Sequence, residues 1–356
     1  MRMLKPALTA LAVVMMATPA IAQVPRAKDG KPDLTGFWTH ASVTPLQRPP
    51  GQKSSAVSEE EAKRIAAGVP MAGVTEEGFK GARYSDPTKG APPKGGKDFG
   101  VQAYDSFWMD PGSKLAFVKG EWRTSRIVEP TNGQLPFKDM EGQAKKRVAN
   151  RERYETGNAA YEGPEATTLG ERCLVFSGLG GPGMGSGLYN NNYEMVQTPT
   201  HMMILAEQAH DARIVPIFAS AEKARVSHKP GAIQPWLADT VGWWEGDTFV
   251  MESVNLKPLQ AENHSFPLSP SGVVTERFTR TGEKDIFYEY TVNDPSIYTQ
   301  PWKVELAFYP SSGVYEYACH EGNYGMHGIL AGAREKERQA AALKTKTTKA
   351  KVASIS

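Results

Sequence analysis

The chain has 356 residues with 41 Lys and Arg against 39 Asp and Glu, so its formal net charge is only +2. Much of the basic charge gathers near the C-terminus, without interleaved aromatic residues, which argues against nucleic-acid binding. After the first 22 residues, no stretch approaches the roughly 20 apolar residues that a membrane helix needs, so we expect no membrane span.

The first 22 residues have the order of a secretory signal peptide. Arg2 and Lys5 precede an uncharged apolar run over residues 7–17, which is too short to span a bilayer. The small-x-small triplet at residues 20–22 then offers a cleavage site before Gln23. We therefore expect a periplasmic or secreted protein. Its mature charge is zero, because cleavage leaves 41 − 2 = 39 basic residues against 39 acidic ones.

Cys173 and Cys319 are the two cysteines of the chain. An even number of cysteines in an exported protein favours a disulfide, and we predict one between these two. On the chain-entropy model, closing so long a loop restricts the unfolded chain by roughly 5 kcal/mol. The alternative is a pair of buried thiols. Haem attachment at His320 is excluded, because the first Cys of C-x-x-C-H is missing.

Residues 23–188 are rich in Gly, Pro and charge, so we predict an irregular, partly helical region that wraps around the rest of the protein. Ser58 and Glu61 form a capping box ahead of a helix over residues 62–67. Further expected elements are a helix over residues 137–156, a loop or partly disordered segment over residues 85–100, and short strands over residues 115–119 and 124–128.

Residues 189–333 show short strands separated by turn signals, which predicts an antiparallel β unit. The expected strands are residues 193–197, 202–208, 212–218, 240–244, 248–255, 273–280, 286–292, 303–308 and 314–319. A meander of this kind can close on itself and remove its exposed edges. We therefore predict a mainly β fold with an up-and-down barrel, favoured over a sandwich, that can hold one small ligand. Residues 334–356 form a basic tail that we expect to be frayed.

Four motifs are spread over nearly all of the mature chain. They are DGKPDLTGFW at residues 29–38, GWWEGDTFV at residues 242–250, ERF at residues 276–278, and Asp294-Pro295. Together they resemble a widespread group of exported bacterial proteins whose later part is similar to lipocalin-like barrels. The resemblance implies export and a barrel of that kind, and it implies no activity.

Strand alternation indicates which polar residues face the barrel interior. Glu276 shares a face with Phe278, so it is the expected inward carboxylate, a catalytic candidate. Tyr288 and Tyr290 share a face with Val292 and would supply hydroxyls to a pocket. The alternative is that these aromatic side chains simply fill the barrel.

The turn around residues 207–213 gathers charged side chains at the expected barrel mouth. His210 is the best candidate for a general acid or base, because imidazole alone titrates near neutrality. Glu207 and Arg213 are candidate ligand-binding residues. Asp211 is equally a turn residue that bonds its own backbone, and a structural or solvent-exposed role for His210 remains open.

His320 and Glu321 are the second pair of catalytic candidates. They follow Cys319, and a bridged cysteine would hold them on a stiff backbone. Structural ion pairs are an equally open interpretation. No metal site is expected, because the donor residues lack the H-E-x-x-H or Cys-pair spacing; these donors are Glu207, His210, His320, Glu321 and His327.

Adjacent tryptophans must point to opposite faces of a strand. One of Trp243 and Trp244 is therefore inside the barrel; we assign Trp244, with Trp302, to the wall of a ligand pocket, although aromatic cores are the commoner explanation. The other would be clamped under the N-terminal region.

The glycine-rich segment of residues 178–187 is interpreted as a flexible linker or lid. It is not a phosphate-binding loop, because no G-K-[ST] follows and the next element is an expected strand. No G-x-S-x-G motif supports serine hydrolase chemistry either. We expect no cofactor, since nucleotide cofactors are scarce outside the cytoplasm.

These observations favour an extracytoplasmic enzyme, a lyase, isomerase or hydrolase, that uses acid–base chemistry on a small hydrophobic or aromatic molecule. His210 would transfer the proton, and Glu276 or Glu321 would orient His210 or act as its counterpart. Tyr288 or Tyr290, together with Arg213, would stabilise the negative charge that develops. The alternatives are a non-catalytic periplasmic protein that binds a hydrophobic ligand, and a structural envelope protein without a ligand. The sequence specifies no oligomeric state.

Overall fold

The computed structural model describes residues 24–69, 110–155, 161, 163–176, 178–264 and 266–353. The expected signal peptide and the expected loop at residues 85–100 lie outside the described residues. Within these ranges, no helix combines the length and apolar character that crossing a membrane requires.

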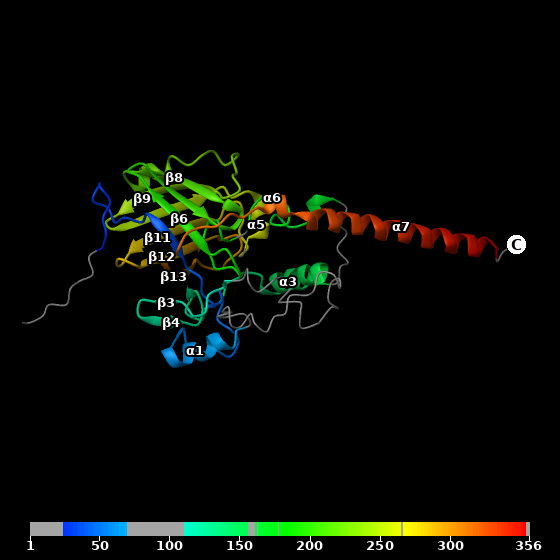
Figure 1. Ribbon diagram of the computed structural model, residues 1–356, viewed down its shortest axis with the longest axis horizontal. Coiled ribbons are helices and arrows are strands. Elements are labelled where there is room, and N and C mark those ends of the chain that lie inside the picture. Colours follow the sequence, from blue (N-terminus) through cyan, green and yellow to red (C-terminus); the bar gives the residue numbers. More distant parts are fainter. Residues whose placement is uncertain are drawn as a thin grey trace, which may run out of the picture.

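A closed β-barrel forms the body of the molecule (Figure 1). Around it, in the described part of the chain, run β1 (Gly36–Thr39), β6 (Asn192–Gln197), β7 (His201–Ala206), β8 (Ala212–Phe218), β9 (Asp239–Glu245), β10 (Thr248–Val254), β11 (Val273–Arg280), β12 (Ile286–Asn293) and β13 (Trp302–Pro310). The pairing of β1 with β13 closes the circle. An additional strand, β5 (Ile127–Glu129), pairs with β13. The predicted β-barrel is therefore confirmed.

The barrel is mixed and not wholly antiparallel, which corrects the predicted meander. β8 and β9 run parallel, with Ile217 opposite Gly242 and Phe218 opposite Trp243. Parallel neighbours need a crossover connection in place of a hairpin. The connection between β8 and β9 contains the helix α4 (Ala221–Arg225), which packs on the outside of β9.

The strand predicted at residues 314–319 does not form. After β13 the chain has no regular structure until α6 (Cys319–Gly322), and the barrel is closed instead by β1 from the N-terminal region. Because β1 pairs with both β6 and β13, it occupies the edge that a further strand after β13 would need. The predicted wrapping region thus contributes a strand to the barrel.

The N-terminal region also contains helices and a small sheet. In α1 (Glu59–Ala67), Ser58 accepts a hydrogen bond from the backbone N–H of Glu61 at 3.3 Å, so the predicted cap is confirmed. The other elements are α3 (Met140–Glu155), the 3₁₀ turn η4 (Pro164–Ala166), and a sheet of β2 (Ala56–Val57), β4 (Glu121–Arg123) and β3 (Phe117–Val118). The sheet and α1 lie beside the barrel (Figure 1).

The remaining elements connect or follow the barrel strands. They are the 3₁₀ turn η5 (Gln208–His210), α5 (Pro258–Asn263), and α7 (Tyr324–Ala353). α7 begins before the predicted boundary at residue 334 and continues through the predicted tail as helix, and it projects away from the barrel (Figure 1).

Alternate side chains of the strands fill the barrel interior. Tyr288, Phe278 and Phe308 are all buried, with ring centroids 4.8 Å apart for Tyr288 and Phe278 and 5.4 Å apart for Tyr288 and Phe308. Trp244 packs against this interior cluster, whereas Trp243 is on the outer face. Trp243 is covered by α4 and not by the N-terminal region, which corrects the expected clamp. The interior is a packed aromatic core.

The glycine-rich segment enters this core. Residues 178–184 are buried, and we call residues 178–187 the glycine plug. The backbone N–H of Met184 donates to the Tyr288 hydroxyl at 2.9 Å, and the Tyr193 hydroxyl donates to the Leu179 carbonyl at 3.0 Å. The plug is therefore a packed part of the barrel and not the predicted linker or lid. Glycine suits this position, because backbone without side chains can approach the core closely.

Gly181 is a position of the plug that has no room for a side chain. Its φ is +95°, and an added Cβ would lie 2.5 Å from the guanidinium carbon of Arg213. We expect Gly181→Ala to lower the free energy of unfolding by about 3 kcal/mol, from left-handed backbone strain and from overpacking. Chemical denaturation measures this loss.

Gly246, in the turn between β9 and β10, is the matched control. It also has a positive φ, +59°, but an added Cβ would meet nothing within 4 Å. Gly246→Ala should therefore lose only the backbone contribution, about 1 kcal/mol. Equal losses for the two variants would contradict the packed position of the plug.

Candidate functional site

The inward carboxylate predicted from strand alternation is held in a charge network inside the barrel. Arg213 donates two hydrogen bonds to Glu276, from Nη1 to Oε2 and from Nη2 to Oε1, the second at 3.0 Å. The Tyr288 hydroxyl donates to Glu276 Oε1 at 2.7 Å. Burial, together with the neighbouring Glu276 carboxylate, raises the pKa of Tyr288 well above its ordinary value. Both oxygens of Glu276 thus have protein donors, while Arg213 Nε is buried without a hydrogen-bond partner among the described residues.

The structure separates the four predicted catalytic residues. Glu276 has no exposed surface, whereas His210, His320 and Glu321 are exposed. His210 is on the turn η5, and the other two exposed residues are on α6. A closed cavity that joins all four is therefore absent from the described structure.

Most of the predicted ligand-binding residues belong to the core. Arg213, Tyr288, Tyr290 and Trp302 are at most 3% exposed, and Trp244 packs against the same interior cluster. Their burial agrees with the alternative that these side chains fill the barrel.

A cavity of about 970 Å³ lies where β6 begins and β7 ends, and we call it the mouth cavity. Its walls come from residues 168–176, residues 189–192 and residues 315–325, together with Asp110. Glu207, which follows β7, also lines it. The volume is that of a typical small-molecule site. Glu207 is thus the predicted site residue that the structure places in a cavity together with Cys319.

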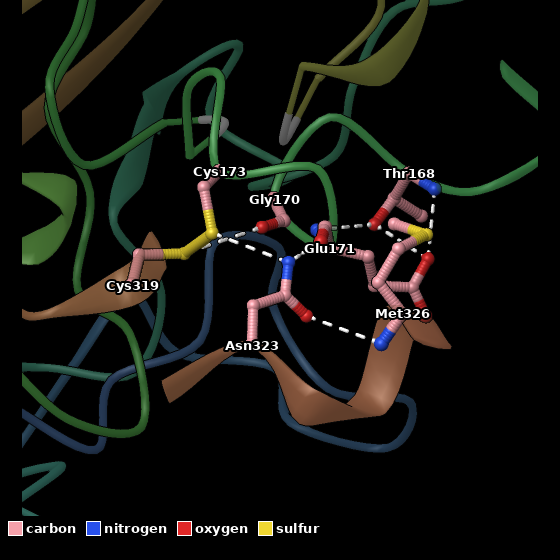
Figure 2. Close-up of a disulfide and its surroundings, with 7 residues drawn as sticks. All are labelled: Thr168, Gly170, Glu171, Cys173, Cys319, Asn323 and Met326. Atoms are coloured by element: carbon pink, nitrogen blue, oxygen red, sulfur yellow. Dashed lines mark hydrogen bonds between the residues drawn. A yellow bond between two sulfur atoms is a disulfide. The ribbon is translucent and has the colours of Figure 1, made fainter. Parts of the chain in front are cut away.

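The predicted disulfide joins two walls of the mouth cavity. Cys173 and Cys319 are bonded, with their Cα atoms 5.7 Å apart (Figure 2). Beside the bond, the Asn323 amide donates to the Glu171 carbonyl at 2.7 Å, and Asn323 Oδ1 accepts from the Met326 backbone N–H at 3.2 Å (Figure 2). The segment that leaves β13 is therefore fastened to the loop in front of the glycine plug.

Glu207 is a buried carboxylate with neutral partners. It is 3% exposed, and its Oε1 and Oε2 accept hydrogen bonds from the side-chain amides of Asn190 at 2.6 Å and Asn192 at 2.5 Å. Both amides also line the mouth cavity. Within the described residues, no Lys, Arg or His forms an ion pair with Glu207, in contrast to Glu276. The carboxylate is oriented, but no described cation compensates its charge.

Asp211 is the second unusual carboxylate of the same turn. Burial raises its pKa to about 7, although a hydrogen bond from the Phe176 backbone N–H, at 3.4 Å, opposes this rise. Phe176 lines the mouth cavity, so Asp211 lies directly behind its wall. A carboxylic acid that titrates near neutrality is suited to acid–base chemistry. From the sequence, we assigned this role to His210, because imidazole ordinarily titrates in that range.

The raised pKa of Asp211 predicts a pH dependence of stability. Between about pH 4 and pH 7 the folded protein binds a proton that the unfolded chain has released, so stability should fall as the pH rises through this range. Asp211→Asn should remove that part of the fall and should be more stable than the wild type at pH 8. Thermal melts at pH 5 and pH 8 measure this difference, and an unchanged pH profile in the variant would contradict it.

Several cavity residues were not identified from the sequence. Phe176, Tyr189, Tyr315 and Tyr317 line the mouth cavity, and the last two were assigned to a strand that does not form. The sequence did contain one indication of this cavity: Tyr315 and Tyr317 lie close to the predicted disulfide at Cys319, at the end of the expected barrel.

Protein-family models, curated proteins and solved structures give no match to this chain.

Proposed function

We propose that this protein is exported and binds a small ligand with an aromatic or apolar body in the mouth cavity. The observation that carries the proposal is a cavity of about 970 Å³ whose lining includes both aromatic rings and a buried, oriented carboxylate, Glu207. Apolar walls with a few convergent polar groups are typical of small-molecule sites. This supports the binding protein over the enzyme that we first inferred.

The barrel interior is the less suitable place for a ligand. Lipocalin-like barrels hold a small ligand inside the barrel, but here Met184 of the glycine plug, Phe278 and Tyr288 are buried together in one cluster. Inside that cluster, Glu276 is already paired with Arg213 through two hydrogen bonds. We therefore place the ligand at the mouth and not in the lumen.

A neutral fluorescent probe tests this proposal. N-phenyl-1-naphthylamine, which brightens in apolar surroundings, should bind the wild-type protein saturably with one site. Ala318 lines the cavity and is exposed, so Ala318→Trp should fill the space and abolish binding. Ala212 is exposed on β8 outside the cavity lining, so Ala212→Trp should bind the probe as the wild type does. Equal binding by the two variants, or no saturable binding by the wild type, would overturn the proposal.

An acid–base enzyme is the second candidate function. Asp211 favours it, because its carboxylate accepts a hydrogen bond from Phe176 of the cavity wall and its pKa is raised to about 7. With p-nitrophenyl esters as the probe of hydrolysis, kcat/KM should rise with pH around a midpoint near 7, because the ionised carboxylate is the base. Asp211→Asn should lose this dependence and about 10²–10⁴-fold in rate. His210→Ala is the control and should retain activity. Wild-type protein without turnover, or variants with equal rates, would contradict this function.

A further inference from the structure

We infer that the ligand of the mouth cavity is an organic cation, in which an amine or quaternary ammonium group is attached to an apolar or aromatic body. The inference rests on the proposed function and specifies the chemical class of the ligand. It follows from the charges that line the cavity, from their lack of counter-ions, and from the arrangement of the aromatic rings.

The lining of the cavity carries negative charge. Four acidic residues line it, Asp110, Glu171, Glu207 and Glu316, and the described lining residues include no Lys, Arg or His. An anionic ligand would meet like charges on several sides. A cationic ligand would meet opposite charge from the two walls that the disulfide joins and from the strand side.

These carboxylates also form no ion pairs with the residues that the structure describes. In the described part of the chain, none of the four forms an ion pair, whereas carboxylates elsewhere on the barrel do: Glu305 with Lys119 and Arg123, and Glu252 with Arg225. The buried carboxylates Glu305 and Glu252 thus have cations beside them, and in the described part of the chain the four at the cavity do not.

Glu207 is the lining residue that a cationic ligand would stabilise most. Its two oxygens accept hydrogen bonds from the amides of Asn190 and Asn192, so its hydrogen-bonding capacity is partly satisfied. Amides are neutral, however, and a buried carboxylate without an opposite charge is unfavourable. The cationic group of a ligand would compensate this charge and would be attracted most strongly there, because Glu207 is buried.

The aromatic rings give an independent indication of the same class. Phe176 and Tyr317 come from the two walls that the disulfide joins, and their rings meet edge to face with centroids 5.6 Å apart and an angle of 74°. Tyr189 and Tyr315 also line the cavity. A ring face that is turned toward the cavity would attract an ammonium group through cation–π attraction.

Displacement of the neutral probe by matched compounds tests the inference. Benzyltrimethylammonium is the cation, neopentylbenzene has the same shape without the charge, and 3-phenylpropionate is the anion. We expect the cation to displace N-phenyl-1-naphthylamine at a concentration at least tenfold below that of the neutral isostere, and the anion to displace it least. Equal potency of cation and isostere, or a preference for the anion, would overturn the inference.

Variants of single carboxylates then show which residues cause the preference for the cation over its neutral isostere. Glu207→Gln should reduce the preference for the cation over the isostere at least fivefold. Glu316→Gln, at an exposed lining residue with less structural importance, should reduce it about twofold and keeps the test valid if the Glu207 variant fails to fold. Glu194→Gln makes the same change of net charge on β6 outside the lining and should leave the preference unchanged. A preference that persists in both cavity variants would overturn the inference.

The two proposals fail in different ways. If the probe binds and Ala318→Trp abolishes binding, while cation and isostere compete equally, then the cavity is a ligand site and only the charge class is wrong. If the probe does not bind in the cavity, the proposed function is wrong and the charge class falls with it.

Discussion

Replacing Arg213 with Ala should lower the free energy of unfolding by about 3–5 kcal/mol. Arg213 is the cation that compensates Glu276, and their side chains are 2% and 0% exposed. Without Arg213, the carboxylate would remain inside an aromatic core, with the Tyr288 hydroxyl as the one hydrogen-bond donor to its side chain within the described residues. The loss would also remove the surface on which Gly181 packs.

Arg277 provides the matched control for Arg213. It lies next to Glu276 on β11 but points outward, where its side chain is 33% exposed and pairs with Glu245 at 2.8 Å. Arg277→Ala should cost less than about 1 kcal/mol, because exposed ion pairs contribute little. Denaturant unfolding at pH 7 compares the two variants. Similar losses would show that the buried pair does not have the importance assigned to it.

A double variant separates the unpaired charge from the lost packing. If the loss in Arg213→Met comes from leaving Glu276 uncompensated, then adding Glu276→Leu should restore much of the stability, since apolar replacements of a buried pair are often well tolerated. If the double variant is as unstable as Arg213→Met, the packing of the arginine is the larger contribution.

Removing the disulfide should have the second large effect. The bond between Cys173 and Cys319 joins residues separated by 146 positions. On the chain-entropy model, the loss of so long a loop lowers stability by up to about 5 kcal/mol. The double variant Cys173→Ser/Cys319→Ser avoids a free thiol, and urea unfolding with and without a reductant measures the effect. Reductant should destabilise the wild type and leave the double variant unchanged.

The same variant should also weaken binding at the mouth cavity. The disulfide holds the segment of residues 315–325 against the loop of residues 168–176, and both segments line the cavity. We expect the affinity for the neutral probe to fall at least threefold, even under conditions where the barrel is folded. Unchanged affinity in the folded double variant would show that the cavity walls do not depend on the bond.

The local pattern of the strands could be predicted from the sequence. Glu276, Tyr288 and Tyr290 face inward in the structure because side chains alternate strictly along β11 and β12, and both strands pair with their sequence neighbours. The N-cap at Ser58 was predictable for a similar reason, since it depends on residues within one helical turn. The disulfide followed from a count of two cysteines in an exported chain.

The long-range pairings could not be predicted in the same way. The closure of the barrel by β1 joins residues near 38 to residues near 310, and the parallel contact of β8 with β9 depends on where α4 packs. Neither pairing has a signal in the residues of the strands themselves. A strand at residues 314–319 was therefore a reasonable but wrong prediction.

The site was predicted in part. The turn that contains Glu207 was identified, but His210 was preferred because its ordinary pKa lies near neutrality. The structure shows that burial gives Asp211 this property instead, with a pKa of about 7, while His210 is exposed. Burial depends on the tertiary packing of Phe176 and the glycine plug, so it could not be inferred from the seven residues of the turn alone.

A crystal structure of the protein with benzyltrimethylammonium tests the central claim most directly. The predicted result is one cation in the mouth cavity, with its ammonium group near Glu207 and its ring against Phe176 or Tyr317. A cation bound inside the barrel, beside Arg213 and Glu276 with the glycine plug displaced, would contradict the account.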